Sequence, residues 1–229
     1  MIAGTETVVF DVLGTLVDEP GGVAAAIGAA TGVGIRRSRR LAEAWLARVA
    51  GEQRRIADGK RPFVGSSVLD AEAAVAVTER VGGGAEALRA LAVASRGLPA
   101  WPDSAREVSR LSRVVPVIGL SNADEETLAP LARRVGLPLG ATVSAERAAA
   151  YKPSAAVYRA AVEAAGVAPE RILMVAAHAW DLRGAQAAGM RVAYVPRPGG
   201  DEPTAQDRFD AGFASLGALV DAFVERERR

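Results

Sequence analysis

From residue 114 onward, short apolar runs alternate with stretches that have the spacing of amphipathic helices. The apolar runs are Val114–Leu120, Gly140–Val143, Ile172–Ala176 and Arg191–Val195. Between them, apolar residues recur at helical spacing over 128–135 and 157–164, and a last helix is predicted at about 215–224. Strands that alternate with helices form a parallel sheet with right-handed crossovers. We therefore predict an α/β core, to which the buried run Thr7–Phe10 adds a strand.

The segment from about Glu19 to Leu98 interrupts this alternation. It has helical patterns that are separated by joints rich in glycine and proline. We interpret it as an all-helical insert that follows the first strand. The predicted domains are an α/β core formed by residues 1–18 and 99–229, and a helical insert formed by residues 19–98.

The composition excludes several classes of protein. Half of the 229 residues are hydrophobic, which is ample for a core, and no apolar run approaches the ~18 residues of a membrane helix. The N-terminus has no signal-peptide pattern, and there is no cysteine for disulfides or thiolate metal sites. The net charge of +1 gives no general attraction to nucleic acid or to an acidic membrane. We expect a cytoplasmic protein that binds neither.

Polar residues stand at the ends of the predicted strands. Asp11 follows the first strand, Ser121-Asn122 follows the second, and Asp181 comes shortly after 172–176. Lys152 precedes Pro153, a residue suited to the first turn of a helix. Each of these residues alone has an ordinary explanation as a helix cap or a surface side chain. Because parallel strands end at the same edge of a sheet, their joint order favours a single site there.

Rare residue types strengthen this interpretation. The chain has only two lysines, one histidine and one asparagine, while arginine and alanine fill most of the positions where such residues usually occur. Lys152, His178 and Asn122 persist against this bias. They are therefore better candidates for a site than their types alone would suggest.

The motifs together resemble those of the haloacid dehalogenase superfamily. The matching residues are Asp11-x-x-Gly14-Thr15, Ser121-Asn122, Lys152-Pro153 with Tyr158, and Asp181. The resemblance implies a Rossmann-like core and identifies the helical insert with the small cap of that superfamily. The short motifs Ser-Asn, Tyr-Lys-Pro and Ala-Trp-Asp resemble most those of the L-2-haloacid dehalogenase (type II) branch. The resemblance to that branch implies a homodimer.

Leu13 separates two chemistries within the superfamily. Most members are magnesium-dependent phosphatases with a second aspartate at this position, which protonates the leaving group and later activates water. Leucine can do neither, and the run His178-Ala179-Trp180 leaves Asp181 without the paired acids that usually hold magnesium. A halide leaves without a general acid. The sequence therefore favours a metal-independent hydrolase with no cofactor, acting on a small molecule.

The resemblance also implies a role for each matching residue. Asp11 attacks the carbon that bears the halogen of a 2-haloalkanoic acid and forms an ester, which water hydrolyses to a 2-hydroxy acid. By the same resemblance, Lys152 holds Asp11, and Thr15 and Ser121 position the nucleophile or the substrate carboxylate. Asn122 and Trp180 help to form the halide and substrate pocket. Tyr158 supports Lys152 or the substrate, and Asp181 supports the hydrolytic water.

The chain departs from the familiar dehalogenases at several positions. Leu13 replaces a tyrosine that lines their pocket, and Trp45 is followed by Leu46 instead of a halide-binding arginine, with Arg48 nearby. His178 replaces an asparagine and is a candidate general base, since imidazole titrates near neutral pH. These differences leave the substrate open. The alternatives are another small substrate, including a phosphate ester with magnesium, and a non-catalytic binding protein.

Overall fold

The computed structural model describes residues 3–227, so the two residues at each end of the predicted core ranges lie outside the described residues. The chain divides into two compact units. The α/β unit combines the chain up to Val17 with the chain from Ala100 onward, and the helical unit is the segment Asp18–Pro99. No helix described in residues 3–227 is long and apolar enough to cross a membrane.

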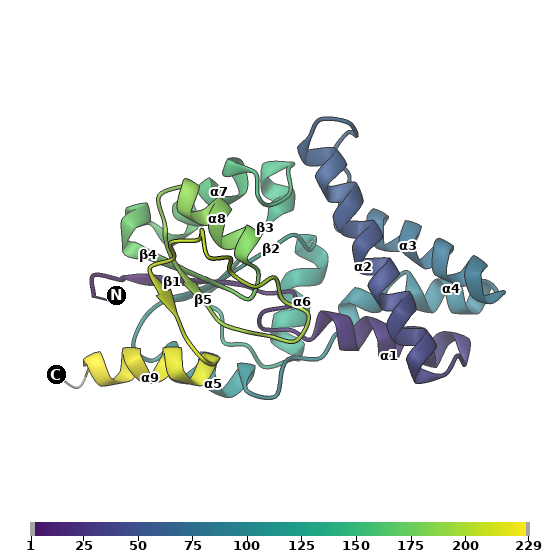
Figure 1. Cartoon of the computed structure of the whole chain (residues 1–229), viewed down its shortest axis with the longest axis horizontal. Coiled ribbons are helices and arrows are strands. Elements are labelled where there is room, and N and C mark those ends of the chain that lie inside the picture. The colour runs from purple at the N-terminus through teal and green to yellow at the C-terminus, as the bar shows by residue number, and fades with distance from the viewer. Residues whose placement is uncertain (1–2, 228–229) are drawn as a thin grey trace. The chain divides into compact units, whose positions relative to one another are not determined.

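The α/β unit is built on an all-parallel sheet of six strands in the order β3-β2-β1-β4-β5-β6 (Figure 1). The strands are β1 (Thr7–Asp11), β2 (Val117–Ser121), β3 (Ala141–Ser144), β4 (Ile172–Ala176), β5 (Arg191–Tyr194) and β6 (Ala211–Gly212). The predicted parallel α/β core is confirmed. The edge strand β6 was missed, because a two-residue strand leaves no periodic pattern.

The second strand begins three residues later than predicted. The N–H groups of Val114 and Val115 donate to the carbonyl of Leu111, at 2.9 and 3.1 Å. These residues therefore close the turn that follows α5, and strand pairing starts only at Val117. The apolar pattern alone cannot tell a buried turn from a buried strand.

Helices cover both faces of the sheet. Helices α7 and α8 lie together on one face, while α5 and α9 lie side by side on the other (Figure 1). The helices of this unit are α5 (Ser104–Leu111), α6 (Glu125–Arg134), α7 (Ala155–Ala165), α8 (Ala179–Ala187), α9 (Leu216–Glu227) and the 3₁₀ turns η2 (Ala145–Ala148) and η3 (Pro169–Arg171). All residues of β1, β2 and β4 are buried, as expected for central parallel strands.

The helical unit consists of α1 (Glu19–Thr31), α2 (Ile35–Ala57), α3 (Ser66–Val81), α4 (Ala85–Leu91) and the 3₁₀ turn η1 (Ala94–Gly97). Its core contains Ile27, Trp45 and Leu69, all nearly inaccessible to solvent. Arg61, in the connection between α2 and α3, pairs with Glu52 at 2.8 Å and with Glu72 at 2.6 Å. This ion-pair network links the two ends of that connection.

The register of the central strands places three chain segments at one edge of the sheet. Asp11 of β1 is paired with Leu120 of β2, and Phe10 is paired with Val175 of β4. The chain leaving each of these strands therefore starts from nearly the same level. In open α/β sheets this carboxyl edge is where ligands bind.

Candidate active site

Asp11 is the last residue of β1, and the turn after it returns Thr15 to its side. Gly14 has a positive φ of 82°, a conformation that glycine adopts without a Cβ penalty. The Thr15 hydroxyl donates to Asp11 Oδ2 at 2.6 Å and accepts the N–H of Ala177 at 2.9 Å. Thr15 thus orients the carboxylate and ties its turn to the chain that leaves β4.

Lys152 lies between two buried carboxylates. Its Nζ is 2.7 Å from Asp11 Oδ1 and 2.6 Å from Asp181 Oδ2, and its side chain is almost fully buried. Burial alone would lower the pKa of Lys152, but the charges of Asp11 and Asp181 raise it above its ordinary value. Lys152 therefore stays protonated and holds both acids.

Asn122 positions this lysine through the backbone. Its side-chain oxygen accepts the N–H of Lys152 at 2.9 Å. The Oγ of Ser121, which is fully buried, accepts the N–H of Ala123 at 3.1 Å. Both contacts shape the loops around the site, whereas the predicted contacts of Ser121 and Asn122 with a substrate or halide stay predictions.

Tyr158 contacts Asp181. Its hydroxyl donates to Asp181 Oδ1 at 2.7 Å, and a Cβ added at Gly184 would lie 2.4 Å from that hydroxyl. Burial, together with the charge of Asp181, raises the pKa of Tyr158, so this side chain acts as a donor. The sequence predicted support of Lys152 or the substrate; Tyr158 reaches Lys152 only through Asp181 and is itself fully buried.

Asp181 is also fully buried, and both of its oxygens are engaged by Lys152 and Tyr158. Burial raises its pKa and the charge of Asp11 adds to this effect, against the opposing charge of Lys152. The predicted role of Asp181 beside a hydrolytic water stays a prediction. The geometry favours Asp181 as the residue that orients Lys152.

His178 reaches the same oxygen of Asp11 as Thr15 does. Its Nδ1 is 3.2 Å from Asp11 Oδ2, and its ring lies so close to Gly14 that a Cβ there would be 2.5 Å from Cε1. Burial lowers the pKa of His178, but the hydrogen bond and charge of Asp11 outweigh burial and raise it above its ordinary value. The imidazole is thus held against the candidate nucleophile.

The pKa of Asp11 reflects these neighbours. Burial alone would raise it, but the charge of Lys152, followed by the hydrogen bond and charge of His178, holds it well below its ordinary value of 3.8. The Lys152 ammonium and the hydrogen bond from His178 therefore favour the ionised carboxylate. An ionised, buried carboxylate at a strand end can act as a covalent nucleophile.

Two further candidates border this cluster. Trp180 is 37% exposed, and its ring centroid is 5.9 Å from Lys152 Nζ and 5.9 Å from the ring of His178. Leu13 is partly exposed in the turn after β1. Both have surface available for an apolar part of a substrate.

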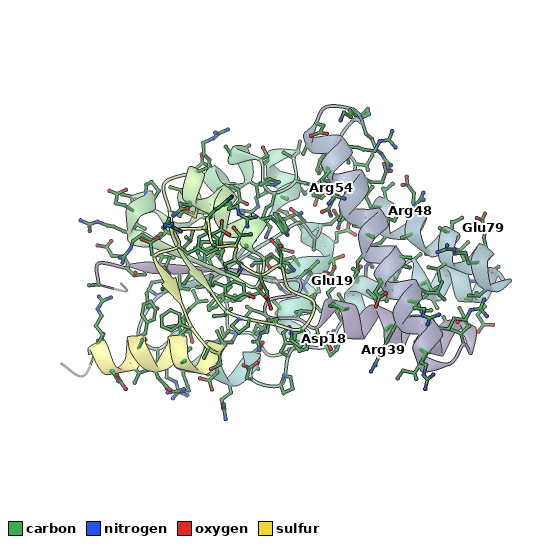
Figure 2. The ribbon with its side chains drawn as sticks, in the orientation of Figure 1. Asp18, Glu19, Arg39, Arg48, Arg54 and Glu79 are labelled. Carbon is green, nitrogen blue, oxygen red and sulfur yellow. The ribbon has the colours of Figure 1, made fainter. Side chains whose placement is uncertain are left out.

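Trp45 and Arg48 belong to the helical unit. Arg48 projects from α2 (Figure 2). Both residues line a cavity of about 510 Å³ whose other walls include Glu79 of α3. Trp45 is 2% exposed and its indole N–H donates to Asp70 Oδ1 at 3.3 Å. The structure brings these two residues together, and their contact with a substrate stays a prediction.

The donor set does not fit a divalent cation. The oxygens of Asp11 accept from Lys152 on one side and from Thr15 on the other, and the Lys152 ammonium stands between Asp11 and Asp181 where a shared metal would need to bind. Within residues 3–227, no three histidine, aspartate or glutamate side chains gather as potential metal ligands.

Sequence reasoning missed one segment near the site. Arg197 and Asp201 lie in the chain that follows β5. Arg197 hydrogen-bonds to the backbone of Thr15, and Asp201 to the backbone of Trp180 at the start of α8. The only local signal was the run Pro-Arg-Pro-Gly-Gly over 196–200, which indicates a turn and no partner.

Comparison with known proteins places the chain in a family. The model of the haloacid dehalogenase-like hydrolase family matches residues 5–189. The chain belongs to this family, and the resemblance inferred from its motifs is confirmed.

Curated relatives match part of the chain. The (S)-2-haloacid dehalogenase 4A of Burkholderia cepacia is 32% identical over 109 residues, which is 46% of this chain and 47% of that protein. The haloacetate dehalogenase H-2 of Moraxella sp. (strain B) is 35% identical over 82 residues, 35% of this chain and 37% of that protein. The matched stretches thus span less than half of these relatives.

Solved structures match nearly the whole chain. The defluorinating L-2-haloacid dehalogenase Rha0230 is 26% identical with a TM-score of 0.85, covering 96% of this chain and 95% of its own. The L-2-haloacid dehalogenase PA0810 has a TM-score of 0.86 at 24% identity, covering 96% and 99%, a similarity of fold. Both of these solved structures are L-2-haloacid dehalogenases, the branch that the motifs resemble.

Proposed function

We propose that this protein is an (S)-2-haloacid dehalogenase that uses Asp11 as its nucleophile. The observation that carries the proposal is the state of Asp11. It is ionised and oriented by Thr15, Lys152 and His178, yet the residue two places on, Leu13, has no proton to give a leaving group. Such a site suits a leaving group that departs without protonation, and the dehalogenase relatives support a halide.

In the first step an oxygen of Asp11 attacks the carbon that bears the halogen. A C–O bond forms while the carbon–halogen bond breaks, and the halide leaves with the bonding electron pair. The product is an ester of Asp11. The Lys152 ammonium stays between Asp11 and Asp181, so the charge and position of the carboxylate are set before the substrate arrives.

In the second step water attacks the carbonyl carbon of this ester. We assign His178 as the group that accepts the water proton, because its imidazole is the titratable side chain that contacts Asp11 and retains access to solvent. The alkoxide leaves as a 2-hydroxy acid by taking a proton back from His178. The restored Asp11 carboxyl then loses its proton to solvent.

Esterification changes the electrostatics that His178 experiences. In the resting site its pKa is raised by the hydrogen bond and charge of Asp11. An ester carries no negative charge, so this contribution disappears and the imidazole loses its proton more readily. His178 therefore becomes a neutral base at the stage at which water must be activated.

Chloride release from L-2-chloropropionate tests the function. With chelator present, we expect stoichiometric chloride and lactate, and we expect the D enantiomer to react more slowly. A panel of bromo-, chloro- and fluoroacids defines the range of substrates. If no haloacid releases halide while a phosphate ester turns over only with magnesium, the protein is a phosphatase; if neither class reacts, the non-catalytic alternative is favoured.

Replacing His178 with glutamine is expected to separate the two steps. Chloride should appear in a burst of one equivalent per site, followed by steady-state turnover about 10²-fold slower than that of the unmodified protein. Mass spectrometry should detect the Asp11 ester. In the unmodified protein, the rate of ester hydrolysis should rise with pH as His178 deprotonates, and a variant that keeps this pH dependence would show that another group is the base.

The helical unit is proposed to act as a cap that contributes Trp45 and Arg48 to substrate binding. Support comes from the cavity that both residues line. The homodimer and the cytoplasmic location likewise stay predictions.

A further inference from the structure

The chain that follows β5 contacts the turn that carries the nucleophile. Arg197 donates from Nε to the carbonyl of Thr15 at 2.9 Å and from Nη1 to Asp103 Oδ2 at 3.0 Å. Its guanidinium lies 5.7 Å from the ring centroid of Trp101, whose indole N–H donates to the carbonyl of Gly14 at 3.1 Å. Trp101 and Arg197 therefore hold the turn after β1 through the successive carbonyl groups of Gly14 and Thr15.

Asp201, four residues after Arg197 in the same segment, contacts the backbone on both sides of His178. The N–H of Asp201 donates to the carbonyl of Ala177 at 3.0 Å, and the N–H of Ala179 donates to the carbonyl of Asp201 at 2.8 Å. The Asp201 carboxylate accepts the N–H of Trp180 at 2.9 Å. His178 is thus fixed by backbone hydrogen bonds on both sides.

Gly200 makes this close approach possible. A Cβ added there would lie 2.5 Å from the carbonyl oxygen of Ala177 and 3.1 Å from that of Arg197. Both atoms belong to the backbone, so neither can yield by rotating a side chain. Any residue larger than glycine must move the 177–180 loop away from the segment.

Thr15 and His178 meet at one atom, although they come from different loops. Both contact Asp11 Oδ2, at 2.6 and 3.2 Å. The segment 196–201 is bonded to both loops, to the first through Arg197 and to the second through Asp201. It is therefore placed to set their separation.

We propose that Pro196–Asp201 is a positioning loop that holds His178 at hydrogen-bond distance from Asp11. The charged groups that face His178 are Asp11 from β1, Lys152 from the loop before α7, and Asp181 from α8. Of these three groups only Asp11 bonds to the imidazole directly, so a small displacement weakens this contact first. The catalytic consequence rests on the proposed function, while the placement of His178 does not.

The experiment compares Gly200→Ala with Gly212→Ala. Gly212 lies on β6, where an added Cβ meets nothing within 4 Å, so this variant controls for the substitution itself. Because His178 is the single histidine of the chain, the NMR titration of one imidazole reports its pKa without assignment. The measurement needs no substrate.

In Gly200→Ala we expect the pKa of His178 to fall by about half a unit or more, about a threefold change in the protonation equilibrium. We expect kcat to fall about tenfold or more, with KM changed less than about twofold, since a misplaced catalytic group slows chemistry more than binding. Gly212→Ala should match the unmodified protein in both. A lower melting temperature with an unchanged histidine pKa and unchanged kcat would overturn the proposal.

A second pair of variants applies if Gly200→Ala does not fold. Asp201→Ala removes the acceptor of the Trp180 N–H, while Asp201→Asn retains an oxygen that can accept it. We expect Asp201→Ala to lower the pKa of His178 and Asp201→Asn to restore it; equal values in both variants and the unmodified protein would contradict the positioning role. If the variants shift the pKa of His178 but the unmodified protein releases no halide, the positioning role of the loop stands and the proposed function is rejected.

Discussion

Asp11→Asn is expected to abolish chloride release from every haloacid, a loss of at least about 10⁴-fold in kcat. The amide is a far weaker nucleophile than the carboxylate, and it cannot form the ester that water later hydrolyses. Asp181 cannot replace Asp11 as the nucleophile, because it is fully buried and both of its carboxylate oxygens are hydrogen-bonded.

The control for this variant is Asp221→Asn. Asp221 lies on α9, pairs with Arg110 at 2.7 Å, and its side chain is 57% exposed. The same chemical change there should leave turnover unchanged. Chloride release from Asp11→Asn at the rate of this control would remove Asp11 from the mechanism.

Isotope labelling identifies the covalent step in the unmodified protein. In H₂¹⁸O with enzyme in excess, the first turnover should give a hydroxy acid whose new oxygen comes from Asp11 and is therefore unlabelled, while the Asp11 carboxyl gains ¹⁸O. Label in the product of that first turnover would indicate direct attack by water on the substrate.

Lys152→Met is expected to lower both stability and activity. It leaves Asp11 and Asp181 buried with no cation between them, and removing one partner of a buried ion pair typically costs about 3–5 kcal/mol in the free energy of unfolding. Without the ammonium, the orientation and charge of the nucleophile are also lost. We expect kcat/KM to fall by about 10²–10³-fold.

The pH dependence of this variant has a definite sign. In the unmodified protein, the pKa of Asp11 lies well below 3.8, so its contribution to stability is complete above that value and is lost as pH falls towards the folded-state pKa. Removing the positive charge raises this pKa. We therefore expect the acid limb of the kcat/KM profile, and the onset of acid unfolding, to move to higher pH in Lys152→Met.

The double variant Lys152→Met/Asp181→Asn separates stability from catalysis. Replacing the second carboxylate removes one of the two unpaired charges, so part of the lost stability should return in chemical denaturation. Activity should not return, because Asp11 still lacks its cation. Recovery of both quantities together would mean that Lys152 serves folding alone.

The elements predicted from the sequence are those with strong apolar periodicity. β4 begins and ends where predicted, and the first strand extends only one residue further, to Asp11. The misplaced start of β2 and the missed β6 share a cause. In both places backbone hydrogen bonds determine the structure: a local turn onto Leu111 delays the start of β2, and pairing with β5 defines β6.

The sequence by itself determined which groups gather at the site. Asp11, Asn122 and Asp181 stand at strand ends, and the geometry of parallel strands brings them to one edge. Lys152 joins them from the loop that precedes α7, because the helix begins at Ala155 and not at Pro153 as predicted. Leu13 also excluded a general acid at the position two residues after the nucleophile, because residues so close in sequence are close in space. These conclusions need only local order and the rules of sheet topology.

Only the tertiary structure decided which atom each group contacts. Lys152 joins Asp11 and Asp181, Tyr158 serves Asp181, and the loop 196–201 holds the backbone on both sides of His178. Lys152 and Asp11 are 141 residues apart, and Arg197 and Thr15 are 182 apart. Periodicity describes neighbours a few residues apart, whereas a hydrogen bond depends on tenths of an ångström between packed elements. The motifs therefore named the participants, and the packing of the sheet and its loops assigned their partners.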